Sequence, residues 1–287
     1  MVAAYVGMVR RYSPVVDEDR TRREVLDKQA ATGTAPPRRV VRGLHVSTLD
    51  AAPFATWDVR VAGTTPDRTV LYLHGGGYTS DIDPWHWRYV AKLARGLGVR
   101  VVLPSYPLAP THTWRDALPS LADLFDRLAV ESPAGVGIMG DSAGGGLALS
   151  VAQRIAGGPG PQPIRLVLIS PWVELSGETP GTELAAAADP WLSLTKLRLY
   201  GRWWAGGEDV RRPEGSPLYG NLAGLPPALV YCGTRDILCP QVRELDERAR
   251  IAGAEWTYVE GPGLIHVYPL LPIPEAKQAW RELVAFW

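Results

Sequence analysis

The chain of 287 residues is poor in cysteine, has no excess of either charge and contains no long apolar run. Its two cysteines, Cys232 and Cys239, are too few for a disulfide framework and favour reduced thiols in a cytoplasm. Thirty basic and thirty acidic residues cancel, so no basic surface invites nucleic acid. No apolar run approaches the length of a membrane span. We therefore expect a cytoplasmic protein whose partner is small or apolar.

The first eleven residues are apolar before they are basic, which is the reverse of the order in a signal peptide. From about residue 68 the chain alternates short apolar runs with amphipathic stretches. This rhythm predicts an α/β fold, with a mostly parallel central sheet and helices on both faces. Apolar runs typical of buried strands lie at 69–74, 99–104, 135–140, 164–170, 227–233 and 255–261. Residues 41–47 and 55–63 resemble an antiparallel pair at the sheet edge.

Two stretches interrupt the alternation. Residues 1–45 resemble one or two helices that precede any strand, and residues 173–222 separate two core strands. That insertion follows the carboxyl end of a strand, where open α/β sheets hold their ligands. We expect N-terminal cap helices over residues 1–45 and a helical cap insertion over 173–222. The core then comprises residues 46–172 and 223–287.

The stretch Gly140-Asp141-Ser142-Ala143-Gly144 places a serine between an apolar strand and a helix that opens with glycines. A tight glycine turn is one explanation of this motif. Strand, turn and helix in this order are also the setting of a nucleophile elbow. Such a turn exposes the serine hydroxyl and directs the free N–H groups of the helix toward developing negative charge. Ser142 is therefore the candidate nucleophile.

A serine hydroxyl needs a general base, and in this fold the acid and then the histidine follow the serine along the chain. His266 is the only one of the five histidines that comes after Ser142. Asp236 follows the apolar run 227–233, at the carboxyl end of a strand, where a turn-capping aspartate is the alternative. We expect Asp236 to be the acid. The remaining aspartates in this interval lie in the insertion or on the polar face of a helix: Asp189, Asp209 and Asp246.

Stabilisation of an oxyanion requires backbone donors. Three glycines follow His74 at the end of an apolar strand, and glycine lets N–H groups turn into a site without a Cβ clash. The N–H of Ala143 would be a further donor. A plain glycine-rich loop is the alternative, and a phosphate loop is disfavoured because no lysine follows at the right spacing. His74 would then brace the loop.

Together these motifs resemble the hormone-sensitive-lipase-like branch of the α/β-hydrolases, esterases that carry both His-Gly-Gly-Gly and Gly-Asp-Ser-Ala-Gly. The resemblance runs from about residue 68 to the end and includes an acid loop, 233–238, and a histidine loop, 263–268. It implies an α/β-hydrolase fold with a cap built from the N-terminal region and the insertion. The residues that it implies as a catalytic triad are Ser142, Asp236 and His266. The N–H groups that it implies as an oxyanion hole are those of Gly76, Gly77 and Ala143.

The chain departs from the family pattern in three places. Pro107 and Thr111 stand where the family usually has an arginine and a glutamate, and Gly146 stands where it often has asparagine. After Asp236 the usual acidic residues are replaced, which bears on how the acid loop is braced. The residues found there are Cys239, Pro240 and Gln241.

These residues predict a carboxylic ester hydrolase. His266 would remove the proton from Ser142, Asp236 would fix the imidazole tautomer, and water would release the acid from an acyl-enzyme. No metal or organic cofactor is required. A lactone or amide hydrolase would use the same triad, and a small-molecule receptor on this fold would be expected to lose a triad member. The natural substrate, the enantioselectivity and the oligomeric state, a homodimer included, stay open.

The chain also contains 11 tryptophans. Scattered tryptophans are usually core residues. The insertion, however, has little else that is bulky and should lie over the carboxyl ends of the strands, where an apolar cleft is typical of a binding site. We expect aromatic side chains to line this pocket and to favour short- to medium-chain acyl esters. The candidates are Trp85, Trp203, Trp204 and Tyr78.

Overall fold

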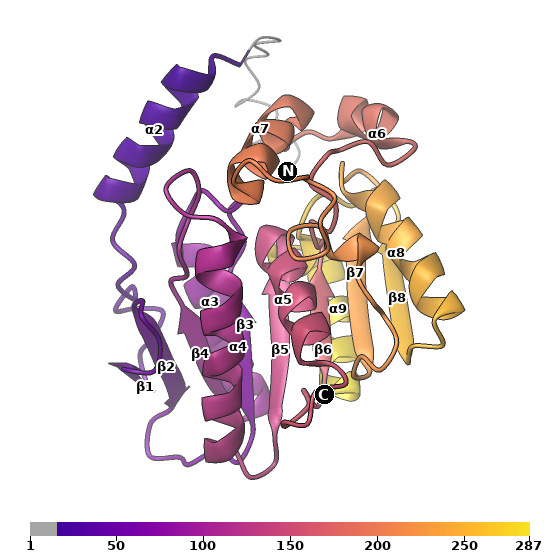
Figure 1. The fold of residues 1–287 in the computed structure, drawn as a ribbon. Helices are drawn as coiled ribbons and strands as arrows, with labels where there is room; N and C mark the ends of the chain where they lie inside the picture. The colour runs from indigo at the N-terminus through magenta and orange to yellow at the C-terminus, as the bar shows by residue number, and fades with distance from the viewer. Residues whose placement is uncertain (1–15) are drawn as a thin grey trace.

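The computed structural model describes residues 16–287, which form one sheet with helices on both faces (Figure 1). The sheet has eight strands in the order β1-β2-β4-β3-β5-β6-β7-β8. β1 pairs antiparallel with β2 and β2 antiparallel with β4, and every other pairing is parallel. The strands are β1 Leu44–Thr48, β2 Thr56–Val61, β3 Thr69–Leu73, β4 Arg100–Pro104, β5 Val136–Asp141, β6 Leu166–Ile169, β7 Ala228–Gly233 and β8 Trp256–Gly261.

The helices divide between the two faces of the sheet. α3 (Pro84–Leu97) and α9 (Pro274–Phe286) pack on one face, and α4 (Trp114–Glu131), α5 (Ser142–Ile155) and α8 (Cys239–Ile251) pack on the other. Because successive side chains of a strand point to opposite faces, the central strands feed both cores. In β3, Val70 and Tyr72 join the core of α3 and α9, whereas Leu71 and Leu73 join the other. Both faces are covered, so the central strands are continuous apolar runs.

The predicted α/β-hydrolase fold and the antiparallel edge pair are confirmed. Within residues 16–45 the chain forms one helix, α2 (Glu18–Ala31), and then continues without a helix to β1. The first fifteen residues of the expected N-terminal cap lie outside the described residues. Among residues 16–287, no helix is both long and apolar enough to span a membrane.

The insertion between β6 and β7 contains α6 (Thr182–Ala188) and α7 (Leu194–Ala205), which lie at the top of the sheet in Figure 1, with α2 at the upper left. Its start is held by α8. The buried side-chain oxygen of Gln241 accepts the N–H of Val173 at 2.6 Å and that of Glu174 at 2.8 Å. Gln241 is one of the residues that replace the family's acidic ones, so a neutral amide braces the chain here.

Candidate active site

The turn between β5 and α5 is tight and displays Ser142. Ser142 has a φ of 53°, a left-handed conformation that is uncommon for a residue other than glycine. A Cβ on Gly144 would strike the carbonyl oxygens of Leu73 and His74, and one on Gly140 would strike the backbone of Gly144. Only glycine therefore lets α5 start this close to β3 and β5. The serine lies at the apex of the turn.

His266 lies between Ser142 and Asp236. Its Nε2 is 2.9 Å from Ser142 Oγ, and its Nδ1 is 2.8 Å from Asp236 Oδ2. Because a carboxylate only accepts, Nδ1–H donates to Asp236, and Nε2 is left to accept the serine hydroxyl. The other carboxylate oxygen of Asp236 accepts the N–H of Leu238 at 2.9 Å. The three side chains that the sequence singles out thus form one line of hydrogen bonds.

The charge on His266 is set by its surroundings. Burial lowers the pKa of the imidazole. The charge and hydrogen bond of Asp236, together with the charges of Asp189 and Asp141, outweigh burial, so the pKa of His266 lies above its ordinary value of 6.5. Asp236 is fully buried and His266 is 3% exposed. With little water to screen it, the carboxylate stabilises a positive charge on the imidazole.

The loops that carry these two residues are joined to each other and to β6. The N–H of Arg235 donates to the carbonyl of Leu264 at 2.9 Å, and that of Gly263 donates to Thr234 Oγ1 at 2.8 Å. After His266 the backbone turns through Val267, whose φ is 47° and whose N–H donates to Ser170 Oγ at 3.0 Å. These contacts fix the imidazole relative to the serine.

The loop after β3 lies beside the elbow, since a Cβ on Gly75 would meet Asp141 and Ser142, and it contains backbone donors. Gly76 and Gly77 have φ values of 121° and 63°, which suit glycine. Among residues 16–287 their N–H groups find no acceptor. The N–H of Ala143 lies in the first turn of α5, where no intrahelical acceptor exists. These three N–H groups are the ones that the family resemblance implies as an oxyanion hole, and that role stays a prediction.

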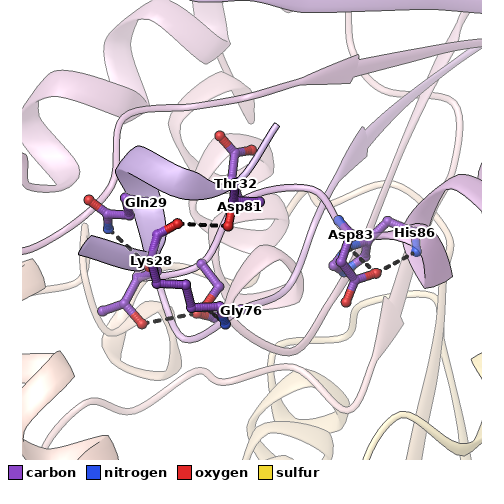
Figure 2. Close-up of a pocket in the computed structure, with 9 residues that line it drawn as sticks. Lys28, Gln29, Thr32, Gly76, Asp81, Asp83 and His86 are labelled. Atoms are coloured by element: carbon purple, nitrogen blue, oxygen red, sulfur yellow. Dashed lines mark hydrogen bonds and ion pairs between the residues drawn. The ribbon is translucent and has the colours of Figure 1, made fainter. Parts of the chain in front are cut away.

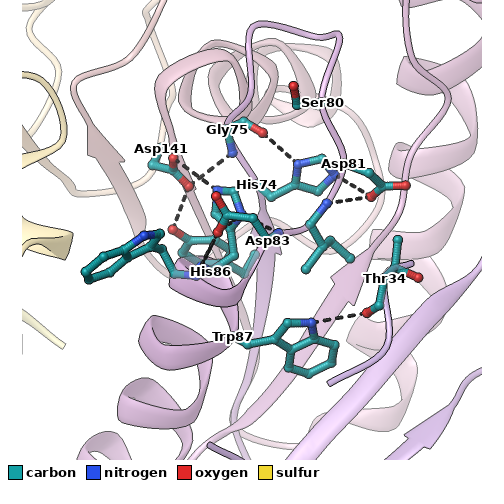
Figure 3. A network of polar contacts seen from close by, with 12 residues as sticks. Thr34, His74, Gly75, Ser80, Asp81, Asp83, His86, Trp87 and Asp141 are labelled. Atoms are coloured by element: carbon teal, nitrogen blue, oxygen red, sulfur yellow. Dashed lines mark hydrogen bonds and ion pairs between the residues drawn. The ribbon is translucent and has the colours of Figure 1, made fainter. Parts of the chain in front are cut away.

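A buried polar network lies behind this loop (Figure 3). Asp141 Oδ1 accepts the hydroxyl of Tyr72 at 2.7 Å and the N–H of Gly75 at 3.1 Å, and so joins the residue before the serine to the glycine loop. Asp141 Oδ2 lies 3.6 Å from His86 Nε2. Burial lowers the pKa of His86, but Asp141 and Asp83 together raise it to about 10. His74 stacks on Tyr106, with ring centroids 4.4 Å apart.

Sequence reasoning did not find Tyr72, Asp141 or His86 as supports of the site. Asp141 stands inside the serine motif. His86 stands inside the stretch Asp81-Ile82-Asp83-Pro84-Trp85-His86, whose spacing fits no common metal site. These residues could have been predicted from the sequence by pairing the carboxylates Asp83 and Asp141 with His86, the histidine on the helix after the glycine loop. In residues 16–287 no three metal-ligating side chains are grouped to hold an ion.

The helix α2 contacts the glycine loop beside a cavity of about 80 Å³ (Figure 2). Lys28, Gln29, Gly76 and His86 are among the residues that line it. The amide of Gln29 donates to the carbonyls of Thr79 and Ala109, at 2.9 Å and 2.8 Å. Lys28 Nζ lies 3.0 Å from Ser80 Oγ. A side chain from the N-terminal region thus fixes the backbone that follows the glycines.

The four aromatic candidates for a substrate pocket occupy different surroundings. Trp204 is fully buried and stacks on Tyr78, with centroids 4.2 Å apart. Trp203 is 8% exposed, and its Nε1–H donates to Glu18 on α2 at 2.9 Å. Trp85 is 44% exposed, and the guanidinium of Arg88 lies over its ring. Their role in substrate binding stays a prediction.

A mostly parallel eight-stranded sheet with a strand–serine–helix turn after β5 defines the α/β-hydrolase class of enzymes. Residues 70–270 match the family described as alpha/beta hydrolase fold. An acetyl-hydrolase from Streptomyces hygroscopicus is 33% identical over 225 residues, which cover 76% of this chain and 75% of that protein. The chain belongs to this family, in its hormone-sensitive-lipase-like branch of esterases. Its reaction is the hydrolysis of esters.

Two further comparisons agree with this assignment. A triacylglycerol lipase from Mycobacterium tuberculosis is 34% identical over 216 residues, which cover 75% of this chain and 45% of that protein. A solved structure of an esterase from the bacterial hormone-sensitive lipase family superposes with a TM-score of 0.82 at 26% identity. The superposition covers 99% of this chain and 95% of the solved one.

The geometry around His266 predicts how its imidazole titrates. In the wild type its pKa should lie above 6.5, because the nearby carboxylates, Asp236 first among them, outweigh burial. In Asp236→Asn the negative charge of this residue is removed while burial remains, so the pKa of His266 should fall below its wild-type value. NMR titration of the imidazole signals, assigned with a His266→Gln variant, measures both. Asp246→Asn removes a carboxylate that pairs with Arg250 on α8 and serves as the control. An unchanged pKa in Asp236→Asn would contradict the interaction described.

Proposed function

We propose that the protein is a serine carboxylesterase in which Ser142, His266 and Asp236 are the catalytic triad and hydrolysis passes through an acyl-enzyme. The observation that carries the proposal is the line of hydrogen bonds from Asp236 Oδ2 to His266 Nδ1, 2.8 Å, and from His266 Nε2 to Ser142 Oγ, 2.9 Å. A nucleophile within reach of a base, which a buried acid orients, is the arrangement that activates a serine.

The proposed reaction has two halves. His266 Nε2 takes the proton from Ser142 as Oγ attacks the acyl carbonyl, and the N–H groups of Gly76, Gly77 and Ala143 stabilise the oxyanion. The imidazolium, stabilised by Asp236, then protonates the leaving alcohol. Water, deprotonated by the same imidazole, attacks the acyl-serine and releases the acid. Protons move only among the serine, the histidine, the alcohol and water, so the reaction requires no metal or organic cofactor.

We assign the substrate-covering role to α2 together with the insertion 173–222, and the catalytic role to residues 46–172 and 223–287. The hydrogen bond from Trp203 on α7 to Glu18 on α2 supports a single cap, because it joins the two covering segments directly. A cytoplasmic location fits the two cysteines, Cys232 and Cys239, which are free thiols.

We further propose that the substrates are small apolar esters with short- to medium-chain acyl groups. Tyr78 directly follows the proposed oxyanion donor Gly77. Its ring contacts those of Trp204 and Trp172, with ring centroids 4.2 Å and 5.4 Å away. Aromatic bulk is thus concentrated beside the position of the acyl carbonyl. An acyl chain has to pass this bulk, which shortens the chain that fits.

Removal of either end of the hydrogen-bonded line should abolish turnover. Ser142→Ala and His266→Ala should each lower kcat by about 10⁴ or more, and the double variant should be little worse than either, because the residues act as a unit. An organophosphate should label the wild type at Ser142 and leave Ser142→Ala unlabelled, as mass spectrometry would detect. Ser193→Ala, at a position whose side chain caps nothing, is the matched control. Near-native ester hydrolysis by His266→Ala would contradict the proposed triad.

Replacing the two buried aspartates near the site, Asp236 and Asp189, should have different effects on kcat and on stability. Asp236→Asn should lower kcat by several orders of magnitude, because it favours the wrong imidazole tautomer. Asp189 instead accepts the N–H groups of Trp191, Leu192 and Ile237. Asp189→Asn should therefore lower the free energy of unfolding by about 1–3 kcal/mol and change kcat much less. Steady-state kinetics and urea unfolding of both variants test this. A larger kcat loss in Asp189→Asn would mean that the acid is misassigned.

The chain-length proposal is tested with p-nitrophenyl esters from acetate to laurate. kcat/KM should be highest for short to medium acyl groups and should fall for long ones. Alanine at a tryptophan that lines the pocket should shift the preference toward longer chains, whereas alanine at a core tryptophan should lower Tm and leave the preference unchanged. Trp85, Trp203 and Trp204 are to be replaced in turn. If none of the three moves the profile, these side chains are structural and the proposed pocket is wrong.

A further inference from the structure

Trp191 combines exposure with contact to His266. It lies between α6 and α7, and its side chain is 46% exposed. Its ring meets the imidazole of His266 edge to face, with centroids 5.7 Å apart and planes at 79°. His266 itself is only 3% exposed. The indole of Trp191 therefore extends from the buried imidazole to the surface of the protein.

The backbone of Trp191 is fixed even though its ring is not buried. Asp189, which is fully buried, accepts the N–H of Trp191 at 2.7 Å through Oδ1 and the N–H of Ile237 at 2.8 Å through Oδ2. Ile237 directly follows Asp236. One carboxylate thus holds the start of the tryptophan's loop against the acid loop. A large aromatic ring that is held in place yet exposed is typical of a surface that binds a ligand.

The chemistry of the proposed reaction says which part of an ester meets this ring. As the tetrahedral intermediate collapses, the bond from the acyl carbon to the alcohol oxygen breaks, and that oxygen takes the proton from His266 Nε2. The alcohol oxygen must therefore lie at Nε2 of the imidazole, and the alcohol leaves as a neutral molecule. The acyl group stays on Ser142, beside the oxyanion donors. A side chain next to the imidazole faces the alcohol portion.

We propose that Trp191 is the wall of the subsite for the leaving alcohol and that it selects esters of flat, apolar alcohols such as benzyl alcohol. This inference rests on the proposed triad. An aromatic alcohol can stack or pack edge-on against the indole and cover its exposed surface, whereas a small alkyl alcohol covers little of it. Trp191 thus sets the preference for the alcohol portion of the ester. The proposed wall of Tyr78 and Trp204 independently limits the length of the acyl chain.

The test compares acetates whose alcohols have similar leaving ability and different shape: benzyl, cyclohexylmethyl and ethyl acetate. In Trp191→Ala, kcat/KM for benzyl acetate should fall about tenfold, and that for ethyl acetate should change less than twofold. Trp191→Phe should keep most of the preference. The rate of deacylation should be the same for the three acetates, because all three give the same acyl-enzyme after the alcohol has left. Trp191→Ala should not change this rate, because the proposed subsite holds only the alcohol. Trp280→Ala on α9, where Lys92 Nζ lies over the indole, is the matched control and should leave the ratio unchanged.

A binding measurement separates this proposal from the triad. Benzyl alcohol should bind to Ser142→Ala, which cannot turn over, and the Ser142→Ala/Trp191→Ala double variant should bind it about tenfold more weakly. Equal binding of benzyl alcohol to the single and double variants would overturn the subsite. An equal loss of kcat/KM for all three acetates in Trp191→Ala would also overturn it, because Trp191 would then only position His266. Wild-type activity in Ser142→Ala would instead overturn the triad, and the alcohol-binding comparison would still decide the role of Trp191.

Discussion

The close approach of β3, β5 and α5 at the serine turn is the constraint on which the site depends. The carbonyl oxygens of Leu73 and His74 leave no room for a Cβ at Gly144, and the backbone of Gly144 leaves none at Gly140. This approach places the first turn of α5 beside the loop after β3. The serine turn and the glycine loop consequently lie side by side, although they come from segments about 65 residues apart in the chain.

Buried carboxylates hold the loops around this volume, and each joins two segments. Asp141 joins the elbow to the glycine loop through the N–H of Gly75. Asp189 joins the insertion to the acid loop, and Asp236 joins the acid loop to the histidine loop. A buried carboxylate is costly unless its oxygens are fully hydrogen-bonded, so each position is specified by its donors. The buried carboxylates thereby fix loops that make no strand pairing with the sheet.

The fold followed from the sequence because its determinants are local. Apolar runs, helical spacing and the glycine-flanked serine are each read within a few residues, and the order of serine, aspartate and histidine follows from the topology. The contacts of Trp191, Gln29 and His86 could not be predicted in this way. Trp191 meets His266 across 75 residues of chain, and Gln29 meets Ala109 across 80. Nothing in the local pattern distinguishes Trp191 from the fully buried Trp204.

The way in which α2 is attached has a consequence for how enzymes of this kind diversify. Where α2 meets the glycine loop, the bonds come from two of its side chains, Lys28 and Gln29, and no strand pairing is involved. Sequence changes elsewhere on this helix leave the hydrogen-bonded ladder of the sheet untouched. Selection can therefore change this helix in small, separate steps while the sheet and the loops at its carboxyl edge stay unchanged.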